Sequence, residues 1–365
     1  MSAVCGPDAE AVTRRLGFDC HDVSPVVSVR APWELAHWTM PLLEVLIVGG
    51  AVFALWHAVR RYRAGDPVNL ALWWASLVYL VVTEPPLYFP EWFGLDRLYG
   101  FIFAHNRFTV QFMGDRLPLY IVAFYPVISQ LAYELVRSLG IFRRRGPLAG
   151  AVAVAFACQV FYEVFDQVGP QLGWWAWNPA NRIVNQPALA SVPMTSMLLF
   201  ASVSMAAMAY LVVRFTGGRR GWRLVPRILA AGILTPFTMA VAGLPSSLFG
   251  GDHPDPTAQA WVLGVELALV WLAGAGLVVA QLRSGERGTD EPLSVFGRYY
   301  PAIYLGGMAV CWIGALPAYL GARDGVTSAG TPIGSGPYAL ACFVAAGLLL
   351  AAQRAAARRD APVAR

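Results

Sequence analysis

The sequence predicts an all-α protein, a polytopic transmembrane helical bundle of about nine spans (eight to nine). The first observation is composition: hydrophobic residues make up 57% of the 365 residues, charged residues make up 13%, and the mean hydropathy is +0.52. A soluble globular domain carries about 25% charged residues. The second is the length of the apolar runs, and the third is the placement of arginine between them. Together they exclude an ordinary soluble enzyme, and the aromatic content excludes a disordered chain.

Each predicted span is an apolar run of about 17–27 residues, which suits a helix that crosses a hydrocarbon core of about 30 Å. The alternating segments of about ten residues that mark a membrane β-barrel do not occur in the sequence. The predicted spans are 39–59, 68–89, 117–137, 147–168, 187–213, 226–248, 258–282, 300–321 and 335–353.

The spans divide the chain into three parts. Residues 1–38 form a polar N-terminal segment, residues 39–355 form the transmembrane domain, and residues 356–365 form a short tail. The N-terminal segment has no basic start followed by a short apolar core, so we expect no cleavable signal peptide.

Arginine placement predicts the topology. All 27 basic residues counted as lysine or arginine are arginines, and 19 of them lie in the connections that follow the odd-numbered spans. By the positive-inside rule these connections face the cytoplasm. The sequence therefore predicts a multi-pass protein of the cell membrane, with the N-terminus outside and the C-terminus in the cytoplasm. The net charge of +5 then reflects topology, and nucleic acid is not an expected partner.

Cysteine usage argues against a metal centre. Cys5 and Cys20 share the outside segment, where an oxidising compartment permits a disulfide, and two unpaired thiols are the alternative. Cys158, Cys311 and Cys342 lie within spans and resemble small apolar packing residues. The sequence has no Cys-x-x-Cys motif and no Cys/His cluster, so we expect no metal site. The absence of lysine also excludes Schiff-base and P-loop chemistry, and we expect no cofactor.

Three acidic residues mark the candidate site, because a charged group at membrane depth is costly and often functional. Glu84, Glu163 and Asp166 fall at the outer ends of spans two and four. Glu163 and Asp166 are spaced i and i+3, so they share a helix face, and Gln159 extends that polar stripe. Two acids in an apolar setting repel each other, so one of them can stay protonated near neutral pH and act as a general acid. The alternative is a structural pair bonded to the next loop.

Three other acids occur in spans. Glu134 lies three residues before Arg137 near the cytoplasmic end of span three, and we expect it to be paired there. Glu44 lies near the outer end of span one and is ambiguous. Glu266 lies near the middle of span seven, and the sequence does not reveal its partner.

Aromatic and amide side chains gather in the predicted outside loops. An ordinary aromatic belt decorates both membrane surfaces, whereas these residues are concentrated on one. The predicted binding residues are Phe103, Asn106, Tyr120, Gln159, Trp174, Trp175, Trp177 and Asn178, and the predicted catalytic residues are Glu84, His105, Glu163 and Asp166.

The two outside hairpins resemble each other. Glu84 is followed by Phe-Ala-His-Asn at 103–106 and by Pro118, which opens the next helix. Glu163 is followed by Trp-Ala-Trp-Asn at 175–178 and by Pro193. Both units enter from the cytoplasm, which predicts a parallel repeat and not the inverted repeat of many transporters. Chance similarity over four residues is the alternative.

The second unit resembles a family. Residues 156–200 are similar to membrane carotenoid-pathway enzymes of the carotenoid 1,2-hydratase and lycopene cyclase domain type, with an echo at 84–120. The matching residues are Glu163-x-x-Asp166-x-x-Gly169, Gly173-Trp174-Trp175-Ala176-Trp177 and Val192-Pro193. The hydratases have a glycine and a tyrosine pair in place of Asp166 and the tryptophans. The cyclases carry acids after the helix-opening proline, where this chain has Leu119-Tyr120 and Met194-Thr195. The resemblance implies a membrane enzyme that acts on an isoprenoid.

The first functional hypothesis is therefore an enzyme that protonates an alkene of an isoprenoid lipid, leading to cyclisation or hydration in an aromatic-lined pocket of the outer half of the membrane. Glu163 or Asp166 would donate the proton, and Glu84 or His105 would accept one or position water. The tryptophans would stabilise the cation, and Asn106 and Asn178 would orient the acids or water.

Two other hypotheses remain open. A transporter would need polar residues at the bilayer midplane on several helices, and the midplane offers mainly Glu266 and the prolines of span six. A lipid-binding or assembly protein would use the aromatic outside surface to dock a partner. The sequence does not predict the oligomeric state.

Overall fold

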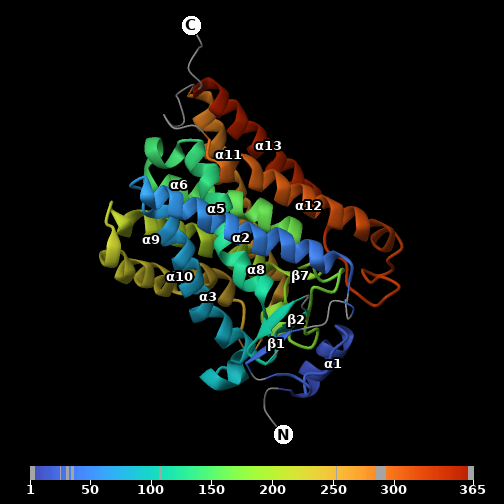
Figure 1. The fold of residues 1–365 in the computed structure, drawn as a ribbon. Coiled ribbons are helices and arrows are strands. Elements are labelled where there is room, and N and C mark those ends of the chain that lie inside the picture. Colours follow the sequence, from blue (N-terminus) through green and yellow to red (C-terminus); the bar gives the residue numbers. More distant parts are fainter. Residues whose placement is uncertain are drawn as a thin grey trace.

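The computed structural model describes residues 5–24, 26–29, 33, 37–106, 109–114, 116–251, 253–284 and 293–360, with side chains to residue 357. Within this part of the chain, nine helices are long and apolar enough to cross a membrane, so the prediction of an all-α, multi-pass membrane protein is confirmed. Helix α1 (Pro7–Arg15) and the end of the last helix lie at opposite ends of the molecule (Figure 1), as an odd number of crossings requires.

Each predicted span corresponds to one long helix or to one continuous helical run. The spans are α2 (Thr39–Arg63), α3 (Val68–Tyr88), α5 (Leu119–Ser138), α6 (Ile141–Asp166), the run α8 (Met194–Leu198), η2 (Leu199–Ser204) and α9 (Met205–Thr216), then α10 (Val225–Ser247), α11 (Pro256–Arg283), α12 (Val295–Leu320) and α13 (Gly336–Asp360).

Two predicted helix starts are wrong for one physical reason. The predicted third and fifth spans begin at residues 117 and 187, but the helices begin at Leu119 and Met194. The residues before them are apolar and extended: β4 (Leu117–Pro118) pairs with β3 (Val110–Phe112), and β7 (Val192–Pro193) pairs with β6 (Ala188–Leu189). Each strand ends in a proline whose backbone is extended just before the first helical turn. Hydropathy alone does not separate such a strand from the helix that follows it.

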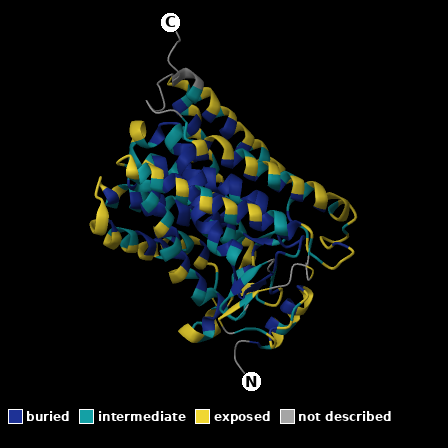
Figure 2. Cartoon of the chain, in the orientation of Figure 1, coloured by how far each residue is buried: buried dark blue, intermediate teal, exposed yellow. Residues whose placement is uncertain are grey.

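Four spans form a closed ring at the centre of the molecule. Helix α3 packs against α5, α5 against α6, α6 against α9, and α9 against α3. In the most apolar stretch of each helix, 89% of the residues of α5 and 78% of those of α6 are buried inside the protein. The corresponding share is 22% for α10, α11 and α12. Figure 2 shows the same contrast, with dark blue segments in the middle and yellow segments outside. The remaining spans surround the ring, and their outer faces are apolar as lipid contact requires.

The short elements gather at one end of the bundle, which we call the loop face. There α3 and α6 end and α5 and α8 begin. The loop face contains α1, β1 (Val27–Val29), η1 (Pro90–Phe93), α4 (Asp96–Tyr99), β2 (Phe103–His105), β3, β4, β5 (Trp175–Trp177), α7 (Arg182–Asn185), β6 and β7. Strand β2 lies beside α1 (Figure 1). The opposite end, where α2, α5, α9 and α11 end, is the arginine face.

The two motifs of the predicted repeat pair with each other. Strands β2 and β5 form an antiparallel pair in which Ala104 faces Ala176, Phe103 faces Trp177 and His105 faces Trp175. Helices α3 and α6 both run toward this sheet, so the two units have the same orientation, as predicted for a parallel repeat. The register therefore gives the two strands a local two-fold relation centred on Ala104 and Ala176.

The asparagine after each strand makes the same contacts in both units. The backbone N–H of Asn106 donates to the Trp174 carbonyl at 2.7 Å, and that of Asn178 donates to the Ile102 carbonyl at 2.8 Å. The Asn106 amide nitrogen donates to the Gly173 carbonyl at 3.3 Å, and that of Asn178 donates to the Phe101 carbonyl at 2.9 Å. These amides therefore hold the loop backbone together, whereas the sequence suggested that they orient acids or water.

Replacing Asn178 with alanine is expected to lower the free energy of unfolding by about 1–3 kcal/mol, because it removes the hydrogen bonds that its amide nitrogen donates to the Phe101 carbonyl and to the Asp8 carboxylate. The effect is measured as a lower thermal unfolding temperature of the purified protein in detergent. Gln186→Ala, at an exposed amide nearby, is the control and should change little. Equal unfolding temperatures for Asn178→Ala and the unmodified protein would contradict the proposed role.

Candidate functional site

Glu84 lies on the inward face of α3, one turn before the helix ends. Its side chain is buried, and the Tyr125 hydroxyl of α5 donates a hydrogen bond to its Oε1. Val82 is exposed on the other side of the same helix. Residues four apart share a helix face, so Tyr88 continues the buried face of Glu84 toward the loop face. The apolar pattern of α3 thus directs one carboxyl group toward the interior of the four-helix ring.

A group of tyrosines surrounds this carboxyl group. The hydroxyl groups of Tyr79, Tyr88, Tyr125 and Tyr162 all lie within electrostatic range of Glu84. The rings of Tyr79 and Tyr125 are 5.4 Å apart. None of these four tyrosines was among the predicted site residues. The spacing from Glu84 to Tyr88 was readable from the sequence, whereas Tyr125 and Tyr162 reach the site from other helices.

Asp166 is the last residue of α6 and belongs to the second unit. It is buried, and its Oδ2 has no hydrogen-bond partner among the described residues. Its carboxyl group and that of Glu84 both lie within electrostatic range of the Tyr162 hydroxyl. A buried acceptor without a partner costs about 1–3 kcal/mol. The arrangement therefore keeps one carboxyl oxygen available to a hydrogen-bond donor that the chain itself does not supply.

Glu163 has different surroundings, although it is three residues from Asp166. Its Oε1 accepts a hydrogen bond from Gln159 Nε2 at 3.1 Å, and its Oε2 accepts one from Gln167 Nε2 at 2.9 Å. The Gln159 carbonyl oxygen in turn accepts from the Ser202 hydroxyl of η2. The Gln167 carbonyl oxygen accepts from the Ser335 backbone N–H at 2.7 Å. Both Glu163 oxygens are therefore engaged in a network that joins α6 to its neighbours.

His105 lies between the two units at the loop face. Its Nδ1 is 2.9 Å from the Tyr88 hydroxyl. Its ring packs against Phe103 at 5.0 Å, Trp175 at 5.8 Å and Tyr120 at 6.2 Å, measured between ring centroids. Burial lowers the pKa of His105 from 6.5 to about 3, because the charged form loses its hydration. The imidazole is therefore neutral near pH 7 and holds one nitrogen that accepts a proton or hydrogen bond.

The buried neutral His105 predicts a specific loss of stability in mild acid. Between pH 6.5 and pH 3 the unfolded chain binds a proton at this residue and the folded chain does not, so stability falls as the pH falls. From pH 6.5 to pH 5 the loss is about 2 kcal/mol. Thermal unfolding of the unmodified protein should depend more steeply on pH than that of His105→Gln, which does not titrate. Parallel pH profiles would refute the expectation.

The tryptophans and Tyr120 form the wall of this end of the ring. Trp174 is fully buried, and its Nε1 donates to the Thr39 hydroxyl at 2.9 Å. The Tyr120 hydroxyl donates to the Trp174 carbonyl at 2.9 Å. Trp175 covers Gly169 so closely that a Cβ there would lie 1.9 Å from its ring. The indole N–H groups of Trp175 and Trp177 are buried and have no hydrogen-bond partner among the described residues.

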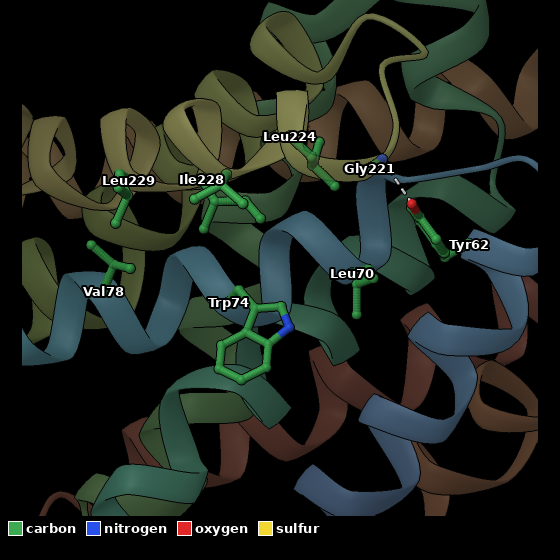
Figure 3. A pocket seen from close by; sticks show the side chains of 9 residues that line it. Tyr62, Leu70, Trp74, Val78, Gly221, Leu224, Ile228 and Leu229 are labelled. Atoms are coloured by element: carbon green, nitrogen blue, oxygen red, sulfur yellow. Dashed lines mark hydrogen bonds between the residues drawn. The ribbon is translucent and has the colours of Figure 1, made fainter.

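The structure thus brings most of the predicted site residues together, and it places two of them in a separate network. Phe103, His105, Tyr120 and the three tryptophans pack together at the loop-face end of the ring. Glu84 and Asp166 lie at the adjoining ends of α3 and α6, where Tyr88 contacts His105 and Phe165 contacts Trp174 and Trp175. Gln159 and Glu163 belong to the network toward α13. A cavity of about 440 Å³ lies elsewhere, between α3 and α10 near the arginine face, and none of the predicted site residues lines it (Figure 3).

The other acids have identifiable surroundings. Glu134 is paired with Arg137 at 2.8 Å, as predicted. Glu44 accepts hydrogen bonds from the Thr109 backbone N–H at 3.0 Å and the Thr109 hydroxyl at 2.5 Å. Glu266 is partly buried, and its Oε2 has no hydrogen-bond partner within the described ranges.

The N-terminal segment contains a disulfide between Cys5 and Cys20, which resolves the open alternative. Cys158, Cys311 and Cys342 are free and buried. Among the described residues, the group with metal-ligand spacing is Cys5, Asp19, Cys20 and His21, whose ligand atoms lie within 4.8 Å of one another. A thiolate is the form of cysteine that binds a metal, and the disulfide removes both thiolates.

Comparison with known proteins gives no match. No family model matches the chain, and no curated protein or solved structure is significantly similar to it.

Proposed function

We propose that the protein is an integral membrane enzyme that protonates a C=C bond of an isoprenoid lipid and so initiates cyclisation or hydration. One observation supports it above the others: Glu84 and Asp166, one from each repeat unit, are both buried beside aromatic side chains, and both interact electrostatically with the Tyr162 hydroxyl. Such a dry, aromatic interior is what acid-initiated alkene chemistry requires. The resemblance of residues 156–200 to membrane carotenoid-pathway enzymes supports the same substrate class.

Asp166 is the proposed proton donor. Its buried Oδ2 has no partner among the described residues, whereas both Glu163 oxygens are occupied by amide donors. In the protonated carboxyl group the O–H bond breaks as a C–H bond forms with one alkene carbon, and the alkene becomes a carbocation. Glu163 has the proposed role of fixing the end of α6, through the network with Gln159 and Gln167.

The aromatic side chains have the proposed role of stabilising the cation. Trp175 and Trp177 contribute ring faces beside Phe103 and His105. A cation over an indole face gains about 0.5–2 kcal/mol, most when water is excluded.

The reaction then ends in one of two ways. In cyclisation, the electrons of a second alkene form a C–C bond with the cation, and loss of a proton gives an isomer of the substrate. In hydration, water adds its oxygen to the cation and loses a proton. His105 is the proposed acceptor, since a carbocation is a far stronger acid than an imidazolium, even one with a pKa of about 3. Glu84 is held by Tyr125 and is the second candidate.

We also propose that the loop face lies outside the cell. The excess of arginine at the other end supports this orientation, and so does the disulfide, since disulfides persist in oxidising compartments. A cysteine introduced at exposed Asp96 on the loop face should react with a membrane-impermeant maleimide in intact cells. Reaction only after cell lysis would contradict the orientation.

The function is tested by expressing the full chain in a bacterial host that makes lycopene and shorter polyprenyl precursors. The extracted lipids are compared by mass spectrometry with those from Asp166→Asn cells. A product heavier by one water indicates hydration, and an isomer of unchanged mass indicates cyclisation. Unchanged isoprenoids, with folded protein in the membrane, would contradict the proposal for those substrates and favour a transporter or a lipid-binding assembly protein.

A further inference from the structure

The cavity between α3 and α10 is a wedge. Leu70, Trp74 and Val78 line it from successive turns of α3, and Val225 and Leu229 line it from α10 (Figure 3). The lining of α3 extends over eight residues, so the wedge runs about 12 Å along this helix. Its walls are almost entirely apolar. Such an apolar cavity disfavours a polar solute, whereas a hydrocarbon chain fits it.

A glycine fixes the closed end of the wedge. A Cβ at Gly232 of α10 would lie 2.6 Å from the Val78 Cβ of α3, so the two helices touch there and leave no space between their backbones. From this contact the lining extends to Leu224 and Gly221 at the arginine face, and the lining residues Trp74, Val225 and Leu229 are exposed along it. The wedge therefore opens at the membrane surface and beside the lipid.

The mouth of the wedge carries positive charge. Tyr62 is fixed there because its hydroxyl accepts a hydrogen bond from the Gly221 backbone N–H at 2.8 Å (Figure 3). The Arg220 guanidinium lies 4.8 Å from the Tyr62 ring centroid and donates to the Tyr62 carbonyl at 2.7 Å. Arg63, on α2, and Arg223 are exposed near the same edge. Trp222, which precedes Arg223, is also exposed at this edge, as an interfacial tryptophan is.

We propose that this wedge binds an anionic phospholipid, with one acyl chain between α3 and α10 and the headgroup phosphate at Arg220 and its neighbours. The apolar wedge, of about 440 Å³, matches the acyl chain of such a lipid. The arginines at its mouth match the headgroup phosphate. Arginine binds phosphate with several N–H donors, and basic residues at a membrane surface attract anionic headgroups. The wedge lies at the opposite end of α3 from Glu84, so this site is separate from the proposed reaction site.

The test is native mass spectrometry of the full purified chain with phosphatidylglycerol or phosphatidylcholine that carry the same acyl chains. Phosphatidylglycerol should bind at least about fivefold more tightly, and Arg220→Gln should weaken its binding about fivefold. Val225→Trp, at an exposed position on the wedge wall, should fill the wedge and reduce the binding of both lipids.

The matched control is Arg97→Gln, which removes an exposed arginine from the loop face and should leave binding unchanged. Equal binding of the two lipids would overturn the anionic preference. Equal loss in Arg97→Gln and Arg220→Gln would also overturn the proposal, because binding would then follow net charge. If Val225→Trp still binds lipid fully, the lipid does not bind in the wedge. These readouts do not depend on any enzyme activity.

Discussion

Asp166→Asn is expected to reduce formation of the isoprenoid product at least about 100-fold, the usual range for loss of a general acid. The replacement keeps the shape of the side chain and removes only the transferable proton. Because Asp166 Oδ2 has no hydrogen-bond partner among the described residues, the amide breaks no existing bond, and the fold should be retained. The measurement is product per amount of folded protein in isolated membranes, with unfolding temperature recorded in parallel.

Two further variants separate chemistry from structure at the same end of α6. Glu163→Gln places an amide against the Gln159 and Gln167 donors, so it should lower the unfolding temperature as well as the yield. Tyr125→Phe removes the hydrogen bond to Glu84 and should reduce the yield without a comparable loss of fold. Full product from Asp166→Asn would exclude Asp166 as the donor and leave Glu163, the other donor considered from the sequence, as the remaining candidate.

Glu134→Ala is expected to have the largest effect on stability, about 3–5 kcal/mol, the usual result of breaking a buried ion pair. The Glu134 carboxylate is almost fully buried and is bound by Arg137 Nε at 2.8 Å and Nη2 at 3.0 Å. It also accepts from Asn69 Nδ2 at 2.9 Å and the Ser294 hydroxyl at 3.0 Å, and His57 Nε2 lies 3.3 Å away. The carboxylate therefore joins α2, α3, α5 and the start of α12.

The loss should appear as a decrease of about 6–20 °C in unfolding temperature in detergent. Glu10→Ala is the matched control, since Glu10 pairs with Arg14 on the exposed surface of α1, and such pairs contribute about 0–1 kcal/mol. If both variants unfold at the same temperature, the network of Glu134 does not hold the four helices together.

The spans could be predicted from the sequence because a bilayer imposes a length and a composition on each helix. The boundaries were less accurate where a local backbone feature intervened. The run Ile141–Asp166 is broken by non-helical Gly146, with φ 85° and ψ 174°, which joins two helices at a kink, and the second helix begins at residue 147, where the sequence placed the start of span four. The starts at Leu119 and Met194 were missed because β4 and β7 are as apolar as the helices they precede.

The candidate site was predicted in part. The repeated motif identified His105, Trp175, Trp177 and the two asparagines. These residues lie in the two short segments that resemble each other, and those segments form the paired strands β2 and β5. The contacts of Tyr125 and Tyr162 depend on how α5 and α6 pack, which no spacing within one helix reveals. The sequence treated Glu163 and Asp166 as one pair, and only the positions of Gln159 and Gln167 distinguish them.

The pairing of β2 with β5 also sets an order of events during synthesis. The two strands are separated by about 70 residues, which a ribosome adds in roughly 4–14 s. In the proposed orientation, α5 and α6 enter the membrane during that interval, and the first hairpin is exported before the strand that completes it. The Asn106 and Ile102 backbone groups that later bind Trp174 and Asn178 face water until then. Closure of the central ring is therefore a late step of membrane insertion, completed only when the second hairpin reaches the same side.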